Sequence, residues 1–523
     1  MKPGPAGPRA HGEEATVSAL ITRSSTVDGI LRRSAARYRD RTALVFAGRT
    51  WSFAELDEAV TRVTAYLLDL GLTKGERVAA LGRNSDGYLI GFLACARAGL
   101  VHVPLNYNLL GGELGYLLAD SGSRALLVDP ALERSLAGVD EAVLAGVEHR
   151  VPLRDADGSV VEIATAAGEL PEVGVEVADT DLAQLLYTSG TTSSPKGAMM
   201  SHKALVHEYL SCIVDLDLTA EDHPLHVMPL YHSAQMHVFL LPWLAVGATS
   251  TVLEVPDPGE VMRRIEQDGH RAFFAAPTLW VAMTNHADFE GRDLSGLRKA
   301  YYGASIMPGP TLRTLLAKAP DCGFYNCFGQ SEIAPLACVL RPEDHAQRPD
   351  SAGKPVLFVQ TRVVDGAGAD VPVGESGEIL YRSPQLCDGY WGNEEASAEA
   401  FSDGWFHSGD LVRMDEEGYV FVVDRIKDVI NTGGVLVASR QVEDAIYTHP
   451  AVAEVAVVGI PDEKWVEAVA AFVVRKGEVD EAGIVEHVRG QLAAFKVPKR
   501  VTFVEDLPRN ASGKILKREL RDG

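Results

Sequence analysis

Apolar and polar residues follow two different patterns along the chain, and each pattern predicts a different part of the fold. Between residues 77 and 128, short apolar runs such as RVAALG and LVHVPL are separated by stretches with helical spacing. A second series of apolar runs, PLHVMP, TSTVLE and RAFFAAP, follows between residues 224 and 277. Strands that alternate with helices form βαβ units, so both series predict doubly wound, mostly parallel sheets.

The pattern changes after Gly353, where the runs QTRVVD, GEILYRS and GYVFVVD are separated by turns instead of helices. This spacing predicts a small antiparallel β unit. From residue 425 onward, helical segments and strands alternate over a length sufficient for an independent domain. We therefore expect an α/β protein with a flexible tail at residues 1–26, a large domain at 27–424 and a small α+β domain at 425–523.

Charge and cysteine content exclude several classes of protein. The 523 residues include 49 Lys and Arg against 72 Asp and Glu, and a net charge of −23 disfavours binding to nucleic acids. The six cysteines lie singly, as is typical of a reduced protein of the cytoplasm. The most apolar stretch, VFLLPWLAVGA, is about half the roughly 20 residues of a spanning helix, so no transmembrane segment is expected.

The segment LLYTSGTTSSPKG, residues 185–197, has the composition of a phosphate-binding loop. An apolar strand runs into small and hydroxylated residues, and a helix is expected after Ser201. Small residues allow successive N–H groups to surround phosphate oxygens, and Lys196 supplies a cation. A Walker loop is excluded, because Pro195 and Gly197 stand where it requires glycine and a hydroxyl residue. On composition alone, a flexible surface loop stays open as an alternative.

Five further motifs follow this loop in order: YYGASIMP (301–308), NCFGQSE (326–332), WFHSGDL (405–411), DRIKDVINTGG (424–434) and LPRNASGK (507–514). Over nearly the whole chain, the set resembles the AMP-forming adenylating superfamily of acyl-CoA and aryl-CoA synthetases, peptide-synthetase adenylation domains and firefly-type luciferases. The resemblance implies a large domain that binds ATP and a carboxylic acid. It also implies that the small domain is mobile and carries a catalytic lysine.

The resemblance assigns roles residue by residue. The expected ATP- and AMP-binding residues are Thr188, Ser189, Gly190, Thr191, Thr192, Lys196, Gly303, Ala304, Ser305, Asn326, Phe328, Gly329, Ser331, Asp410 and Arg425. Glu332 is the expected catalytic ligand of Mg²⁺, a hard cation that binds carboxylate and phosphate oxygens. Lys514 is expected to neutralise charge when the substrate carboxylate attacks the α-phosphorus. Asp424 is the expected hinge, and Gly433 and Gly434 are expected to line the tunnel for a phosphopantetheine thiol.

The run MPLYHSAQMHVFLLPWL, residues 228–244, resembles the segment that lines the acyl pocket of this superfamily. His232 would orient the substrate carboxylate, and Met236, Phe239 and Trp243 would form the apolar wall, although a role in the core is equally compatible with these residue types. The run lacks the Asp that pairs with an amino acid's ammonium group, and leaving that group unpaired would be costly. We expect a fatty or aryl acid as substrate, with a fatty acid first.

Departures from the family pattern leave the thiol acceptor open. After the paired glycines many acyl-CoA ligases read ENVYP, whereas this chain reads VLVAS at residues 435–439, and the usual Glu of the next helix is Gln441. The expected reaction is formation of acyl-AMP and pyrophosphate, followed by acyl transfer to CoA. An acyl carrier protein is the alternative acceptor.

Other classes of protein fit the sequence less well. A lipase-like hydrolase needs GxSxG, and GQSEI at residues 329–333 lacks the second glycine. A zinc protease needs HExxH, and His207-Glu208 has no histidine at position 211. A scaffold that only binds nucleotide would tolerate loss of the lysine, and Lys514 is present.

Overall fold

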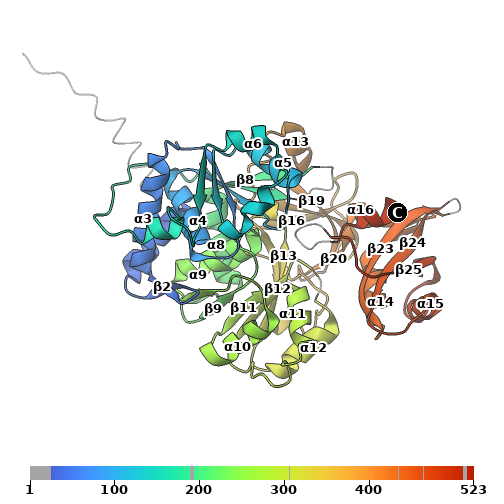
Figure 1. Cartoon of the computed structure of the whole chain (residues 1–523). Helices are drawn as coiled ribbons and strands as arrows, with labels where there is room; N and C mark the ends of the chain where they lie inside the picture. The colour runs from blue at the N-terminus through green and yellow to red at the C-terminus, as the bar shows by residue number, and fades with distance from the viewer. Residues whose placement is uncertain are drawn as a thin grey trace, which may run out of the picture. The chain divides into compact units, whose positions relative to one another are not determined.

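The computed structural model describes residues 25–188, 194–305, 307–433, 435–462, 465–509 and 515–522 (Figure 1). The chain forms two compact units, and each contains segments that are distant in sequence. The first comprises Met1–Pro256, Ser331–Pro335 and Pro384–Gly392, and the second comprises Asp257–Gln330, Leu336–Ser383 and Asn393–Gly523. Within the described residues, no helix combines the length and the apolar character needed to cross a membrane.

The first unit contains a six-stranded sheet of the predicted doubly wound kind, in the order β6-β5-β3-β4-β7-β8. All neighbouring strands are parallel except β7 and β8. The strands and the helices between them are β3 (Arg77–Leu81), α4 (Asp86–Ala98), β4 (Val101–Leu105), α5 (Gly112–Ser121), β5 (Ala125–Val128), η1 (Pro130–Leu136), α6 (Glu141–Gly146), β6 (His149–Pro152), α7 (Val160–Ala164), β7 (Leu182–Thr188) and β8 (Lys196–Ser201). Strands β4 and β5 are buried along their whole length, as expected of parallel strands that are covered on both faces.

The first unit also contains the strands β1 (Thr42–Phe46), β2 (Arg49–Ser52), β9 (Pro224–His226) and β10 (Ser250–Val252). β1 and β2 form a hairpin, with Ala47 and Gly48 at φ 47° and 82° in its turn, and β1, β10 and β9 are parallel. The remaining helices of this unit are α2 (Val27–Arg37), α3 (Phe53–Asp69), α8 (His202–Asp215), the π-helix η2 (Ala234–Leu240), α9 (Leu241–Val246) and η3 (Ser331–Ile333). Ser52 caps α3 through reciprocal hydrogen bonds with Glu55, which fix the start of the helix.

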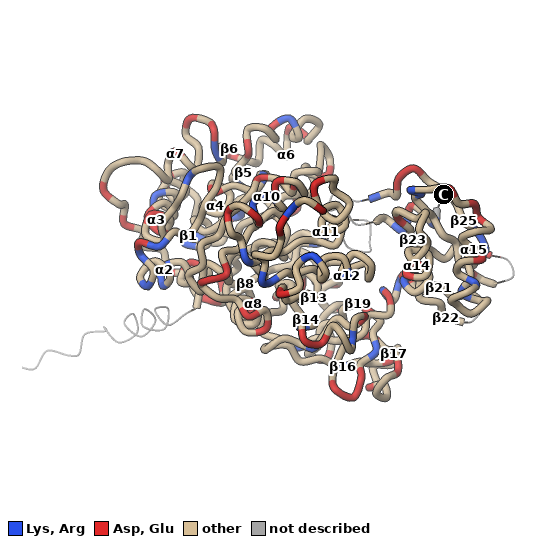
Figure 2. Tube along the Cα trace, turned by 90° about the horizontal axis from the view of Figure 1, so that it is seen from below, with Lys and Arg blue, Asp and Glu red and all other residues tan. Residues whose placement is uncertain are grey.

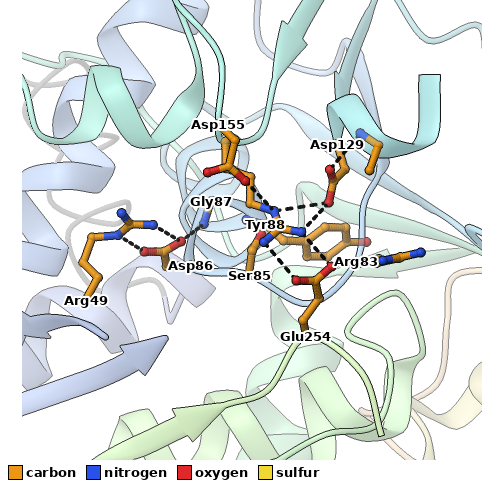
Figure 3. A network of polar contacts seen from close by, with 11 residues as sticks. Arg49, Arg83, Ser85, Asp86, Gly87, Tyr88, Asp129, Asp155 and Glu254 are labelled. Atoms are coloured by element: carbon orange, nitrogen blue, oxygen red, sulfur yellow. Dashed lines mark hydrogen bonds and ion pairs between the residues drawn. The ribbon is translucent and has the colours of Figure 1, made fainter. Parts of the chain in front are cut away.

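Polar contacts hold the connection between β3 and α4 in place (Figure 3). Asp86, fully buried at the first position of α4, accepts hydrogen bonds from Arg49 Nε at 2.5 Å and from Trp51 Nε1 at 3.0 Å. Nearby, Glu254 accepts a hydrogen bond from Arg83 Nη1 at 3.1 Å. A buried carboxylate is stable only when it is paired and hydrogen-bonded, so these contacts fix the start of α4.

The second unit begins with the parallel strands β11 (Ala272–Ala275), β12 (Lys299–Gly303) and β13 (Gly323–Gly329), and β14 (Leu336–Leu340) and β15 (Lys354–Pro355) extend them antiparallel. The helices here are α10 (Pro258–Asp268), α11 (Pro277–Thr284), α12 (Gly309–Lys318) and η4 (Pro342–Asp344). The predicted antiparallel unit is also confirmed. It contains β16 (Gln360–Val364), β17 (Ser376–Arg382), α13 (Glu394–Ala400), β18 (Phe401–Ser402), β19 (Trp405–Met414) and β20 (Val420–Arg425).

The C-terminal part of the second unit has its own sheet and its own core. Its elements are η5 (Ile426–Asp428), β21 (Ile430–Thr432), β22 (Val435–Val437), α14 (Ser439–Tyr447), β23 (Val452–Asp462), β24 (Val466–Arg475), α15 (Glu481–Arg489), η6 (Ala494–Lys496), β25 (Arg500–Val504) and α16 (Lys517–Asp522). Apolar residues of α14, α15 and the strands, among them Val442, Ile446, Val457, Val469 and Ile484, are fully buried together. This confirms the predicted α+β pattern. Acidic and basic residues are interspersed along the trace of both units (Figure 2).

Candidate functional site

The predicted phosphate-binding loop lies at the tip of the hairpin between β7 and β8. Thr188 ends β7, Lys196 begins β8, and the two residues pair across the hairpin. The loop residues Ser189, Gly190, Thr191 and Thr192 lie outside the described residues. Residues 196–201 form strand β8, which the sequence did not indicate, and α8 then begins at His202, directly after Ser201 as expected. The N-cap is confirmed, since Ser201 Oγ accepts a hydrogen bond from the amide of Ala204.

Glu332, in η3, lies beside this hairpin. Its Oε1 accepts hydrogen bonds from Thr188 Oγ1 at 3.3 Å and from the hydroxyl of Tyr390 at 3.1 Å. A carboxylate and a hydroxyl from distant segments are thus brought together, and oxygen donors of this type suit Mg²⁺. No group of three or more His, Cys, Asp or Glu in the described part of the chain is placed to hold a metal. Mg²⁺ at Glu332 would therefore need phosphate oxygens as further ligands.

The segment Pro384–Gly392 carries Tyr390, a residue that the sequence motifs do not single out. The amide of Cys387 donates to the carbonyl of Glu332 at 2.8 Å, and the amide of Trp391 donates to the carbonyl of Gly197 at 2.8 Å. The segment therefore contacts both Glu332 and the strand that begins at Lys196. No short-range pattern could have indicated this, because residues 196, 332 and 390 meet only in the folded chain.

His232 lies in the same unit, in the loop that follows β9. Its neighbour Ser233 has its Oγ 3.5 Å from Oγ of Ser331, so His232 and Ser331 are brought close together. Burial lowers the pKa of His232 to about 4, so its imidazole is neutral at pH 7. A neutral imidazole can donate or accept a hydrogen bond to a substrate carboxylate, but it adds no charge.

Asn84, another residue that the sequence analysis missed, holds the loop that leads to His232. Its Nδ2 donates to the carbonyls of Val227, Met228 and Leu253 at 3.0–3.2 Å. Its Oδ1 accepts from the amide of Leu230 at 2.7 Å. Because Asn84 is almost fully buried, these bonds satisfy an amide side chain that water cannot reach.

The predicted acyl-pocket residues Met236, Phe239 and Trp243 lie in η2 and α9, and all three are buried. The rings of Phe239 and Trp243 are 5.7 Å apart, and Trp243 Nε1 donates to Asp222 Oδ2 at 3.0 Å. The packing of Trp243 fits the core interpretation as well as the pocket interpretation, and the pocket role stays a prediction.

The predicted adenine-binding residues belong to the second unit. Gly303 ends β12, Ala304 and Ser305 follow it and are exposed, and Asn326, Phe328 and Gly329 lie on β13. A Cβ at Gly303 would meet the carbonyl oxygen of Cys327 at 2.3 Å, so the close approach of β13 accounts for this glycine. Ala304 has φ 65°, which turns the chain sharply at the end of β12.

Asp410 and Arg425, the predicted ribose contacts, pair across β19 and β20. Arg425 Nε lies 2.5 Å from Asp410 Oδ1, and the carboxylate of Asp410 is almost fully buried. Asp424, the predicted hinge residue, accepts hydrogen bonds at its Oδ2 from the amide of Ser439 at 2.5 Å and from Ser439 Oγ at 2.8 Å. Ser439 stands where the family segment ENVYP has its proline. It therefore gives Asp424 two hydrogen-bond donors, an amide and a hydroxyl, and a proline at position 439 could supply neither.

Gly433 follows β21 and has φ 63°, and its amide donates to the carbonyl of Trp465 at 2.5 Å. A Cβ at Gly433 would meet the indole ring of Trp465 at 2.9 Å. Gly434 and Lys514 lie outside the described residues. Arg509, within the lysine motif, and Ile515, directly after it, pair as an antiparallel bridge, so the chain positions on either side of residues 510–514 are held together.

The chain is similar to known proteins over most of its length. Two family models match the chain: the AMP-binding enzyme at residues 31–391 and the AMP-binding enzyme C-terminal domain at residues 441–514. A feruloyl-CoA synthase of Amycolatopsis sp. is 38% identical over 482 residues, which are 92% of this chain and 95% of the relative. The fatty acid–[acyl-carrier-protein] ligase ScoC of Streptomyces coeruleorubidus is 34% identical over 501 residues, 92% of this chain and 93% of the relative.

A similar architecture occurs in a solved structure. The crystal structure of ATP-bound MatB from Rhodopseudomonas palustris superposes with a TM-score of 0.86 at 31% identity, and the alignment covers 95% of this chain and 98% of MatB.

Proposed function

Because the chain belongs to the AMP-binding enzyme family, we propose that it is a ligase that activates an aromatic carboxylic acid with ATP and transfers the acyl group to CoA. The observation that carries the proposal is the meeting of Thr188, Lys196 and Glu332 around the tip of one hairpin. A hydroxyl, a cation and a carboxylate are the groups required to hold the phosphates of ATP together with Mg²⁺.

The proposed reaction has two steps. An oxygen of the substrate carboxylate attacks the α-phosphorus of ATP, the bond to the β-phosphate breaks, and pyrophosphate leaves. The thiol sulfur of CoA then attacks the acyl carbon, AMP leaves with that carboxylate oxygen, and the thiol proton is released. Lys196 and Lys514 would balance phosphate charge in the first step, and neutral His232 would orient the carboxylate by hydrogen bonding.

An aromatic acid replaces the fatty acid of our first expectation. The feruloyl-CoA synthase is more similar to this chain than the fatty-acid ligase is, at 38% against 34% identity. The similarity to ScoC and the altered segment at residues 435–439 favour one alternative, a ligase that loads a fatty acid onto an acyl carrier protein.

A panel of acids tests the substrate class. We expect hydroxycinnamic and other aromatic acids to give kcat/KM for pyrophosphate release at least about tenfold above that of saturated fatty acids, a difference of about 1.4 kcal/mol in transition-state binding. Higher kcat/KM for the fatty acids would contradict the aromatic preference and leave the ligase reaction intact.

Glu332→Gln tests the metal role, since it keeps the shape of the side chain and removes its charge. We expect acid-dependent turnover to fall about 10²-fold at 1–2 mM Mg²⁺, and high Mg²⁺ to restore part of it. The measurement is pyrophosphate release over a Mg²⁺ titration. Coincident titration curves for variant and parent would mean that Glu332 is not a metal ligand.

A further inference from the structure

Tyr390 lies between the lysine and the carboxylate of the phosphate-binding hairpin and contacts both. Its hydroxyl donates to Glu332 Oε1 at 3.1 Å, and Nζ of Lys196 lies over its ring, 5.2 Å from the centroid. The side chain is nine-tenths buried. One side chain therefore contacts both charged groups: its hydroxyl donates to the carboxylate of Glu332, and the face of its ring lies against the ammonium group of Lys196.

The backbone around Tyr390 is fixed from two sides. Residues 388 and 389 exchange hydrogen bonds with Met199 of β8 at 2.9 Å, and Tyr390 itself forms a β-bridge with Ala198. On the other side, Gln385 contacts the carbonyl of Ile333, the residue after Glu332. The position of the ring is therefore set by the strand that begins at Lys196 and by the turn that carries Glu332.

Among the described residues Lys196 and Glu332 form no ion pair with each other, although Lys196 lies over the ring of Tyr390 and Glu332 accepts from its hydroxyl. A direct pair would neutralise the two charges that ATP and Mg²⁺ need. A lysine and a carboxylate close together attract each other, so a group that holds them apart keeps each available for the nucleotide.

We infer that Tyr390 is a positioning residue of the adenylation site, which keeps Lys196 and Glu332 separate and oriented for the phosphates and for Mg²⁺. The inference rests on the proposed function, since it takes Glu332 as the metal ligand and Lys196 as the phosphate cation. Tyr390 acts through these two residues and takes no part in the bond changes.

Two substitutions separate the two contacts. Tyr390→Phe removes the hydroxyl and keeps the ring over Lys196, and Tyr390→Leu removes both contacts. Tyr187→Phe is the matched control, because the hydroxyl of Tyr187, on β7, donates to a different carboxylate, Asp120 Oδ2, at 2.6 Å. The control thus loses the same kind of bond close to the hairpin without touching Glu332.

Binding is measured without turnover, by calorimetric titration of each protein with a non-hydrolysable ATP analogue and by Mn²⁺ binding followed by electron paramagnetic resonance. For Tyr390→Phe we expect Mn²⁺ affinity in the presence of the analogue to fall about tenfold, the usual scale for one hydrogen bond to a charged group. For Tyr390→Leu we also expect the affinity for the metal-free analogue to fall several-fold, because Lys196 becomes free to pair with Glu332. KM for the acid should stay at the parent value in Tyr390→Phe.

The inference is overturned if Tyr390→Phe binds Mn²⁺ as the parent does, or if Tyr187→Phe loses the same affinity, since that would indicate a general loss of structure. Glu332→Gln separates this result from failure of the proposed function. Weaker Mn²⁺ binding in Glu332→Gln with parental binding in Tyr390→Phe would contradict only the role of Tyr390, whereas parental binding in Glu332→Gln would contradict the metal role itself.

Discussion

Lys514→Ala is expected to lower acid-dependent pyrophosphate release by a factor of about 10²–10³. Formation of thioester from supplied acyl-AMP should stay close to the parent rate. In the proposed reaction the lysine serves only the first step, in which an anionic carboxylate approaches an anionic phosphate and the developing charge must be neutralised. The bridge between Arg509 and Ile515 closes the loop that carries it, so the substitution should leave the ends of the loop in place.

Both half-reactions of Lys514→Ala are measured separately, by pyrophosphate release and by thioester formation from synthetic acyl-AMP and thiol. Lys499→Ala is the matched control, because it removes an exposed lysine of the same part of the chain while its backbone amide keeps its bond to Val469. Adenylation by Lys514→Ala at the rate of this control would contradict the assignment of the catalytic lysine.

Gly433→Leu is expected to produce the opposite result, with acyl-AMP formed and little thioester released. Gly433 has φ 63°, and any Cβ there would meet the ring of Trp465 at 2.9 Å, so a side chain must displace that ring or the strand. If the thiol arm passes this glycine, a leucine blocks it, whereas residues 188, 196 and 332 are untouched. The measurement is the ratio of acyl-AMP to thioester in a single turnover.

Gly418→Leu controls for backbone strain in this experiment. Gly418 has φ 84° with nothing within 4 Å of an added Cβ, so its leucine variant shares the cost of about 1–2 kcal/mol for a left-handed residue without a clash. If both leucine variants release thioester equally well, Gly433 does not line the thiol route.

Much of the fold could be predicted from local pattern. The alternation of apolar runs with helical segments predicted the parallel strands, and the turns between the apolar runs after Gly353 predicted the antiparallel unit of β16, β17, β19 and β20. Strand β8 was missed because six residues between a loop and a helix are too few to show a period of two. Pairing with β7, which the sequence does not show, decides its conformation.

The candidate site was predictable only where a motif carries it. Thr188, Lys196 and Glu332 all lie in motifs; Thr188 bonds to Glu332 and pairs with Lys196 across the hairpin, and Asp410 and Arg425 pair across neighbouring strands. Their roles toward ATP stay predictions. Asn84 and Tyr390 form hydrogen bonds to segments more than 50 residues away. Such contacts depend on tertiary placement, which residue type and spacing do not specify.

The fate of the carboxylate oxygens of the substrate tests most directly whether the reaction passes through an acyl-AMP intermediate. We would incubate the enzyme with ATP, Mg²⁺, CoA and an aromatic acid labelled with ¹⁸O in its carboxylate, and measure the products by mass spectrometry. An acyl-AMP intermediate predicts one ¹⁸O atom in AMP, unlabelled pyrophosphate, and an acyl-CoA thioester that retains the other ¹⁸O. Formation of labelled phosphate together with ADP, or of AMP without label, would contradict an acyl-AMP intermediate.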